Sequence, residues 1–148
     1  YCMSRIRGKD TRPEMVVRRW LHSEGFRYSL HSRRLPGCPD IVLRRYHTVI
    51  FINGCFWHGH PGCDKFRMPR SNVEFWQEKI RRNKERDAQE VAALEALGWN
   101  VIVVWECELS RWARDLTLRN LVDAVRRNIE PESIHPIPLS VRKLSLKE

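Results

Sequence analysis

A loop rich in cysteine, histidine and aromatic side chains constrains the fold more than any other feature of this chain. It occupies residues 54–63 and directly follows residues 48–52, an apolar, β-branched run that predicts a strand. Cysteine and histidine at short spacing bind soft divalent metals. We therefore expect a metal ion to fix this loop against the strand.

Four side chains can supply the nitrogen and sulfur ligands of a tetrahedral zinc site. Cys55, His60 and Cys63 lie in the loop, and Cys107 follows residues 100–105, a continuous apolar run that predicts a buried central strand. If that strand runs beside the one preceding the loop, zinc would join the loop to the sheet. Four protein ligands close the coordination sphere, so such a zinc would be structural and not a Lewis acid.

His58 is an alternative ligand in place of His60, and the spacing leaves both assignments open. The histidine that is not bound to metal carries an imidazole, which is the side chain best suited to act as a general base near neutral pH. In a third interpretation Cys107 is merely buried and the loop cysteines are free thiols.

The remaining elements predict a mixed sheet flanked by helices. Capping boxes at residues 11–14 and 71–74 predict the starts of two helices that end at Gly25 and Gly98. The expected strands cover residues 26–30, 41–43, 48–52 and 100–105, and a third helix covers residues 117–129. We expect a single domain over 1–148, with a basic N-terminal arm at 1–10 and a C-terminal tail at 130–148.

The charge balance predicts a polyanionic partner. Lysine and arginine number 27 against 18 aspartates and glutamates, which gives a formal net charge of +9. Most of the excess is arginine, which forms bidentate contacts with phosphates. A basic face that only meets solvent is the alternative interpretation, since net charge is only the first sign of nucleic-acid binding.

The five cysteines bear on the cellular compartment. Their odd number and their position near histidines favour metal binding in a reducing cytosol over a disulfide framework. No apolar run is long enough to cross a bilayer, so we expect a cytoplasmic protein with no membrane partner.

Two carboxylates are candidates for chemistry. Asp40 follows Pro39 at the start of the apolar run 41–43, where its carboxylate could bind Mg²⁺, an ion that takes few protein ligands. A turn or cap residue is the alternative for a lone aspartate. Glu14 either completes its capping box or lies near the catalytic histidine.

Large aromatic side chains in a polar loop need a physical reason. Phe56 and Trp57 either cover the metal site or stack on nucleic-acid bases. Trp76 lies on the first turn of the long helix, where helical spacing favours a place in the core.

Several long, ordered blocks of the sequence resemble the very-short-patch-repair (Vsr) DNA mismatch endonucleases. The resemblance runs from about residue 3 to about residue 110. The blocks are residues 3–14 (MSRIRGKDTRPE), 35–40 (LPGCPD), 54–58 (GCFWH), 74–76 (EFW), 83–87 (NKERD), 97–99 (LGW) and 104–107 (VWEC).

This resemblance implies a restriction-endonuclease-like fold of the PD-(D/E)xK class with a structural zinc. It also implies a monomer that nicks double-stranded DNA on the 5′ side of the thymine in a T:G mismatch, with Mg²⁺ as cofactor. Such mismatches arise when 5-methylcytosine deaminates, and family members accompany a cytosine-5 DNA methyltransferase. A protein of this kind would be associated with the bacterial nucleoid when bound to DNA.

The resemblance also assigns roles to residues. Asp40 and the backbone carbonyl of Ile52 would hold Mg²⁺, and His58 would be the catalytic histidine with Glu14 close to it. Asn53 is a departure, because the best-known member has Thr-His where this chain has Ile52-Asn53. Asparagine can bind a phosphate through hydrogen bonds but cannot act as an acid at neutral pH.

The remaining roles concern zinc and DNA. Cys55, His60, Cys63 and Cys107 match the zinc ligands of the family. Met3, Phe56, Trp57 and Trp76 match residues that contact DNA at the mismatch.

Two other functions remain alternatives. The first is a restriction- or homing-type site-specific endonuclease of the same fold. The second is a zinc-stapled DNA-binding module that does not cut.

Overall fold

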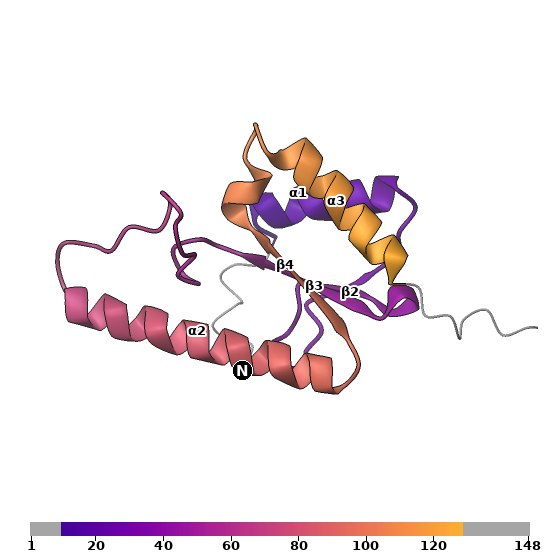
Figure 1. The fold of residues 1–148 in the computed structure, drawn as a ribbon. Coiled ribbons are helices and arrows are strands. Elements are labelled where there is room, and N and C mark those ends of the chain that lie inside the picture. The colour runs from indigo at the N-terminus through magenta and orange to yellow at the C-terminus, as the bar shows by residue number, and fades with distance from the viewer. Residues whose placement is uncertain (1–9, 129–148) are drawn as a thin grey trace, which may run out of the picture.

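Four strands form one mixed sheet in the computed structural model, which describes residues 10–128 (Figure 1). The sheet order is β1-β2-β3-β4. The strands are β1 (Ser29–Leu30), β2 (Ile41–Leu43), β3 (Thr48–Asn53) and β4 (Asn100–Trp105). The helices are α1 (Arg12–Ser23), α2 (Val73–Ala96) and α3 (Arg114–Arg127), with 3-10 turns η2 (Arg44–Tyr46) and η3 (Glu106–Leu109). Within the described part of the chain, no helix has the length and apolar character needed to cross a bilayer.

Strand direction follows from the connections. β2 and β3 pair antiparallel through the short turn η2, and His47 closes the turn in the left-handed conformation. β3 and β4 pair parallel in a register from Thr48 opposite Asn100 to Asn53 opposite Trp105. A parallel pair needs a crossover, which α2 supplies.

The predicted position of residues 100–105 in the sheet is wrong in one respect. The run forms β4 as expected, but β4 is an edge strand, and most of its side chains are only partly buried. An apolar run indicates burial but does not reveal which strands will be neighbours. β2 and β3 fill the centre of the sheet instead.

Local patterns in the sequence predicted some ends of the helices and strands correctly and others incorrectly. α1 begins where predicted, because the Thr11 hydroxyl accepts a hydrogen bond from the Glu14 backbone N–H at 3.4 Å. The Glu14 carboxylate, which a capping box would direct to the Thr11 N–H, accepts from the Asp10 N–H instead. α2 begins differently, at a left-handed Asn72 without a side-chain cap, so the expected capping box at residues 71–74 is absent. β1 is shorter than the predicted strand at 26–30, and α3 begins three residues before the predicted Thr117.

The helices cover both faces of the sheet, with α1 and α3 on one face and α2 on the other (Figure 1). The face under α1 and α3 carries the larger core, which includes Val17, Leu21, Ile50, Leu121 and Val125. On the opposite face, Leu94 of α2 packs with buried side chains of β2 and β3. The result is a three-layer α/β/α arrangement.

The N-terminal half of α2 extends beyond the sheet, and the Cys/His loop lies along it (Figure 1). The Asn83 side-chain amide donates a hydrogen bond to the Trp57 carbonyl at 2.8 Å. Gly59 approaches the helix so closely that an added Cβ would lie 2.7 Å from Ile80 Cγ2 and 3.0 Å from Lys84 Cδ. Gly59 also has a φ of +61°, which disfavours any side chain.

Two glycines of the loop allow a matched test of this contact. We expect Gly59→Ala to lower the free energy of unfolding by about 2–4 kcal/mol, because left-handed strain and overpacking add together. Gly62 has a similar φ of +68° but nothing near its Cβ position, so Gly62→Ala should cost only about 1 kcal/mol. Urea denaturation followed by tryptophan fluorescence measures both, and equal losses would contradict the close packing of the loop on α2.

Candidate active site and metal centre

Asp40 and Ile52 meet at one end of the β2–β3 pair. The Ile52 backbone N–H donates a hydrogen bond to Asp40 Oδ2 at 2.7 Å. This bond fixes the Asp40 carboxylate beside the backbone of Ile52, whose carbonyl was the second expected Mg²⁺ ligand. Both groups offer oxygen atoms, the donor type that a hard cation such as Mg²⁺ prefers.

His58 is held by a carboxylate that the sequence analysis did not select. Its Nδ1 lies 2.6 Å from Asp87 Oδ2, and both side chains are about four-fifths buried, at 18% and 20% exposure. We expected Glu14 to be near His58 and to orient it, but Asp87 does so instead. Asp87 is the last residue of the NKERD block in the long helix. It was not predicted because most of its neighbours in the sequence are also charged.

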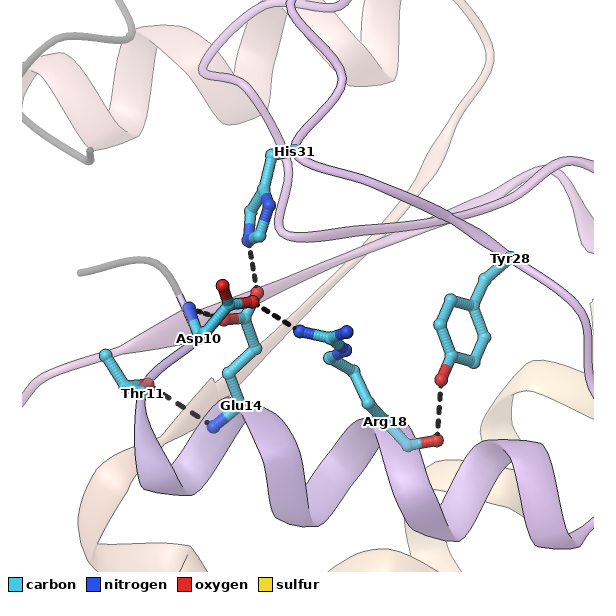
Figure 2. Close-up of polar contacts among 6 residues, drawn as sticks. All are labelled: Asp10, Thr11, Glu14, Arg18, Tyr28 and His31. Atoms are coloured by element: carbon cyan, nitrogen blue, oxygen red, sulfur yellow. Dashed lines mark hydrogen bonds and ion pairs between the residues drawn. The ribbon is translucent and has the colours of Figure 1, made fainter. Parts of the chain in front are cut away.

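Glu14 belongs to a different network at the start of α1 (Figure 2). Its carboxylate is 1% exposed and accepts a hydrogen bond from the Asp10 backbone N–H at 2.6 Å. The other oxygen contacts Nε2 of His31, a residue that was not among the predicted site residues. The Arg18 guanidinium binds the Asp10 carboxylate at 2.6 Å.

Asn53 ends β3 and is buried, with 5% of its surface exposed. Within residues 10–128, its side-chain Oδ1 has no hydrogen-bond partner. A buried acceptor without a donor costs about 1–3 kcal/mol.

The Cys/His cluster joins the loop to the end of β4. One ligand atom from each of Cys55, His60, Cys63 and Cys107 lies within 4.8 Å of the others, which fits one tetrahedral ion. The Cys107 backbone N–H donates to Cys55 Sγ at 3.4 Å, and the His60 ring stacks on Trp105 with centroids 4.1 Å apart.

Two cysteines are not part of this cluster, and one of them, Cys2, lies outside the described residues. Cys38 is disulfide-bonded, whereas Cys55, Cys63 and Cys107 carry free thiols. The expectation of no disulfides is therefore wrong for Cys38, and metal binding by the three clustered cysteines stays a prediction.

Two of the three clustered thiols have raised pKa values, mainly because they are buried. Burial and the neighbouring thiols Cys55 and Cys63 raise the pKa of Cys107 to about 12. Burial also raises the pKa of Cys55. Metals bind cysteine as thiolate, so a bound cation would supply the charge that makes this deprotonation favourable.

Aromatic side chains gather beside the loop. Phe56, Trp57 and Trp76 pack edge to face, with centroid distances between 5.2 and 5.9 Å. Trp57 is 50% exposed, and Phe75 beside Trp76 is 58% exposed. Trp76 is only partly buried, so its expected place in the core is wrong.

Lys79 makes cation–π contacts with two of the same aromatic side chains. Its ammonium lies 5.5 Å from the centre of the Trp57 ring and 5.8 Å from that of Trp76. Lys79 and Phe75 were not among the predicted residues, although each lies within one helical turn of Trp76. Met3, the other expected DNA contact, lies outside the described residues.

Comparisons with known proteins give the class of protein, which is a DNA endonuclease. Residues 1–65 match the family described as DNA mismatch endonuclease Vsr. The chain belongs to this Vsr family, as the resemblance predicted.

Curated relatives extend the match beyond residue 65. The chain is 50% identical over 124 residues to the type II nicking enzyme V.XorIIP of Xanthomonas oryzae pv. oryzae, across 83% of this chain and 90% of that protein. It is 51% identical to the type II nicking enzyme V.NmeAIP of Neisseria meningitidis, across 76% and 80%. It is 43% identical to the DNA mismatch endonuclease Vsr of Escherichia coli, across 72% and 68%.

The two loop histidines give a direct test of the metal centre. We expect about one equivalent of a soft divalent metal in the purified protein, and its loss in His60→Ala and Cys107→Ala. These variants should melt about 10 °C lower. In a chain of this size each kcal/mol of lost unfolding free energy lowers the midpoint by about 2–4 °C, so this decrease corresponds to a loss of roughly 3–5 kcal/mol. Elemental analysis measures the metal, and His58→Ala should retain it. Loss of metal in His58→Ala with retention in His60→Ala would reverse the assignment.

Proposed function

We propose that the protein is a Mg²⁺-dependent, strand-specific endonuclease that nicks DNA on the 5′ side of the thymine in a T:G mismatch. The observation that carries this proposal is the hydrogen bond from the Ile52 N–H to the Asp40 carboxylate, which brings together two oxygen donors of the expected magnesium site. The mismatch substrate is supported by the name of the Escherichia coli relative, which is a mismatch endonuclease.

Asp40 and the Ile52 carbonyl would hold Mg²⁺, which when bound neutralises charge that develops on the scissile phosphate. Isoleucine can replace the threonine of the best-known family member at position 52, because the backbone and not the side chain supplies the oxygen. The Asn53 side chain ends the same strand, and its buried oxygen would accept a hydrogen bond from water in the occupied site.

His58 would remove the proton from the attacking water. Its Nδ1 faces Asp87 Oδ2, so Nδ1 carries the proton and Nε2 is left as the base. Asp87 then stabilises the imidazolium that forms when Nε2 accepts the proton. The water oxygen forms the new bond to phosphorus, and the bond from phosphorus to the leaving oxygen breaks.

The aromatic cluster would recognise the mismatch by its deformability. Phe56, Trp57 and Trp76 pack together, and they would enter the stacked bases from this cluster, with Met3 as a further contact. Separating a base step costs a few kcal/mol, and less at a mispair. This difference would favour T:G over T:A.

The cluster of Cys55, His60, Cys63 and Cys107 would hold a structural zinc that fixes the loop carrying His58, Phe56 and Trp57. We further propose that the enzyme acts as a cytoplasmic monomer at the nucleoid, where a cytosine-5 DNA methyltransferase generates the modified base whose deamination creates the substrate.

A site-specific nicking enzyme is a second candidate function, because two close relatives bear the name type II nicking enzyme. It would use the same chemistry. It would differ in cutting a matched duplex as readily as a mismatched one.

Strand-resolved cleavage separates these functions. Two end-labelled duplexes that differ only in a T:G or T:A pair are incubated with and without Mg²⁺. We expect a single Mg²⁺-dependent nick beside the mispaired thymine, about 10- to 100-fold faster than in the T:A duplex, as a difference of 1–3 kcal/mol in base opening implies. Asp40→Ala should not nick.

Equal cutting of both duplexes would favour the site-specific enzyme. Binding of DNA without any cleavage, across a panel of flanking sequences, would favour a non-cleaving binding module.

The His58–Asp87 pair gives a separate prediction about chemistry. His58→Ala should lower the single-turnover nicking rate by about 10²–10⁴-fold, the usual contribution of a general base. Asp87→Asn should lower it in the same direction, with metal content and DNA affinity unchanged. Glu95→Gln, an exposed change on the same helix, is the matched control. A wild-type rate in Asp87→Asn would remove Asp87 from the mechanism.

A further inference from the structure

Glu14 is a buried carboxylate for which the nicking scheme has no direct use. It is 1% exposed, and a charge so placed is costly unless hydrogen bonds compensate it. Two such contacts are present, one from the Asp10 backbone N–H at 2.6 Å and one with His31 Nε2 (Figure 2). His31 comes from a distant part of the chain, so it attaches α1 to the sheet.

His31 lies directly opposite Asp40. β1 pairs with β2 through Ser29 opposite Val42 and Leu30 opposite Ile41, and the next pair in this register is His31 and Asp40. The His31 backbone N–H donates a hydrogen bond to the Asp40 carbonyl at 3.1 Å, which continues the ladder by one residue. One residue thus contacts Glu14 through its side chain and Asp40 through its backbone.

The backbone of His31 is held in an unfavourable conformation. Its φ is +45°, in the left-handed region where a non-glycine residue costs roughly 1 kcal/mol or more. Such a conformation persists where surrounding contacts determine it. The bonds to Glu14 and Asp40 are those contacts.

We propose that His31 is a positioning residue for the nicking reaction. It ties the buried Glu14 carboxylate of α1 to the start of β2, and it thereby holds Asp40 where its carboxylate meets the Ile52 N–H. The proposal rests on the function proposed above. A displacement of about 1 Å at a reacting group can cost about 100-fold in rate, so a restraint on Asp40 has a kinetic consequence.

The outer part of the network supports a hydrogen-bonding role for these groups over a metal-binding one. Asp10, Glu14 and His31 are close enough to share an ion. However, the Arg18 guanidinium already binds the Asp10 carboxylate at 2.6 Å, and a cation there would face its positive charge. The Tyr28 hydroxyl fixes the Arg18 backbone by donating to its carbonyl at 2.8 Å.

The test compares His31→Ala, His31→Gln and the exposed control His22→Ala with the wild-type protein. We expect His31→Ala to lower kcat for the T:G duplex by about 10- to 100-fold with KM unchanged. Glutamine places an amide donor near the position of Nε2, so His31→Gln should restore most of the rate. His22→Ala should match the wild type.

A second measurement does not depend on activity. Amide hydrogen exchange in the DNA-free protein, followed by NMR, reports the bonds that Asp10 and Ile52 N–H make to the carboxylates of Glu14 and Asp40. Both amides should exchange faster in His31→Ala and at the wild-type rate in His31→Gln. If His31→Ala does not fold, the double variant Glu14→Gln/His31→Ala should fold. The neutral glutamine at position 14 does not need the histidine to compensate a buried charge.

The outcomes separate the two proposals. If the wild-type protein fails to nick, while amide hydrogen exchange still depends on His31, the proposed function is overturned and the link from Glu14 to Asp40 through His31 is supported. A wild-type protein that nicks, with His31→Ala unchanged in kcat and exchange, would overturn the link alone. Stoichiometric binding of an added transition metal that is lost in His31→Ala would also overturn it, because His31 would then be a metal ligand.

Discussion

The parallel pairing of β3 with β4 is the interaction on which the rest of the site depends. It brings Asn53 opposite Trp105, so the two segments that leave these strands start from the same edge of the sheet. One segment is the loop with Cys55 and His60, and the other carries Cys107. A parallel pair also requires a crossover helix, and that helix supplies Asp87 to His58 and Trp76 to the aromatic cluster.

The Cys/His cluster would restrain a loop that has no regular secondary structure. Between the end of β3 and the start of α2 the chain forms no helix or strand, so few backbone hydrogen bonds fix it. A metal ion held by the four side chains would close this loop onto β4, and Gly59 packs it against α2. A loop restrained at both places can hold His58 at a fixed distance from Asp87 without a strand or helix of its own.

Much of the fold could be predicted from local signals, whereas the partners of the catalytic groups could not. The β-branched runs gave β2, β3 and β4, and the Thr11 cap gave the start of α1. The edge position of β4 depends on tertiary pairing, which hydropathy does not encode. Asp87 and His31 were missed because their partners lie 29 and 17 residues away, in other elements. The clustering of Cys55, His60, Cys63 and Cys107 could be predicted because three of them are close in sequence.

The carboxylates around the site show why these missed partners matter. Asp40 accepts a hydrogen bond from a backbone N–H, Asp87 pairs with an imidazole, and Glu14 has one contact of each kind. In a chain with a net charge of +9, acidic side chains have many arginines as alternative partners. Bonds to the backbone and to histidine fix each carboxylate in the DNA-free protein. In the proposed function the chemistry of the site would therefore be preorganised, while recognition would depend on how readily the DNA deforms.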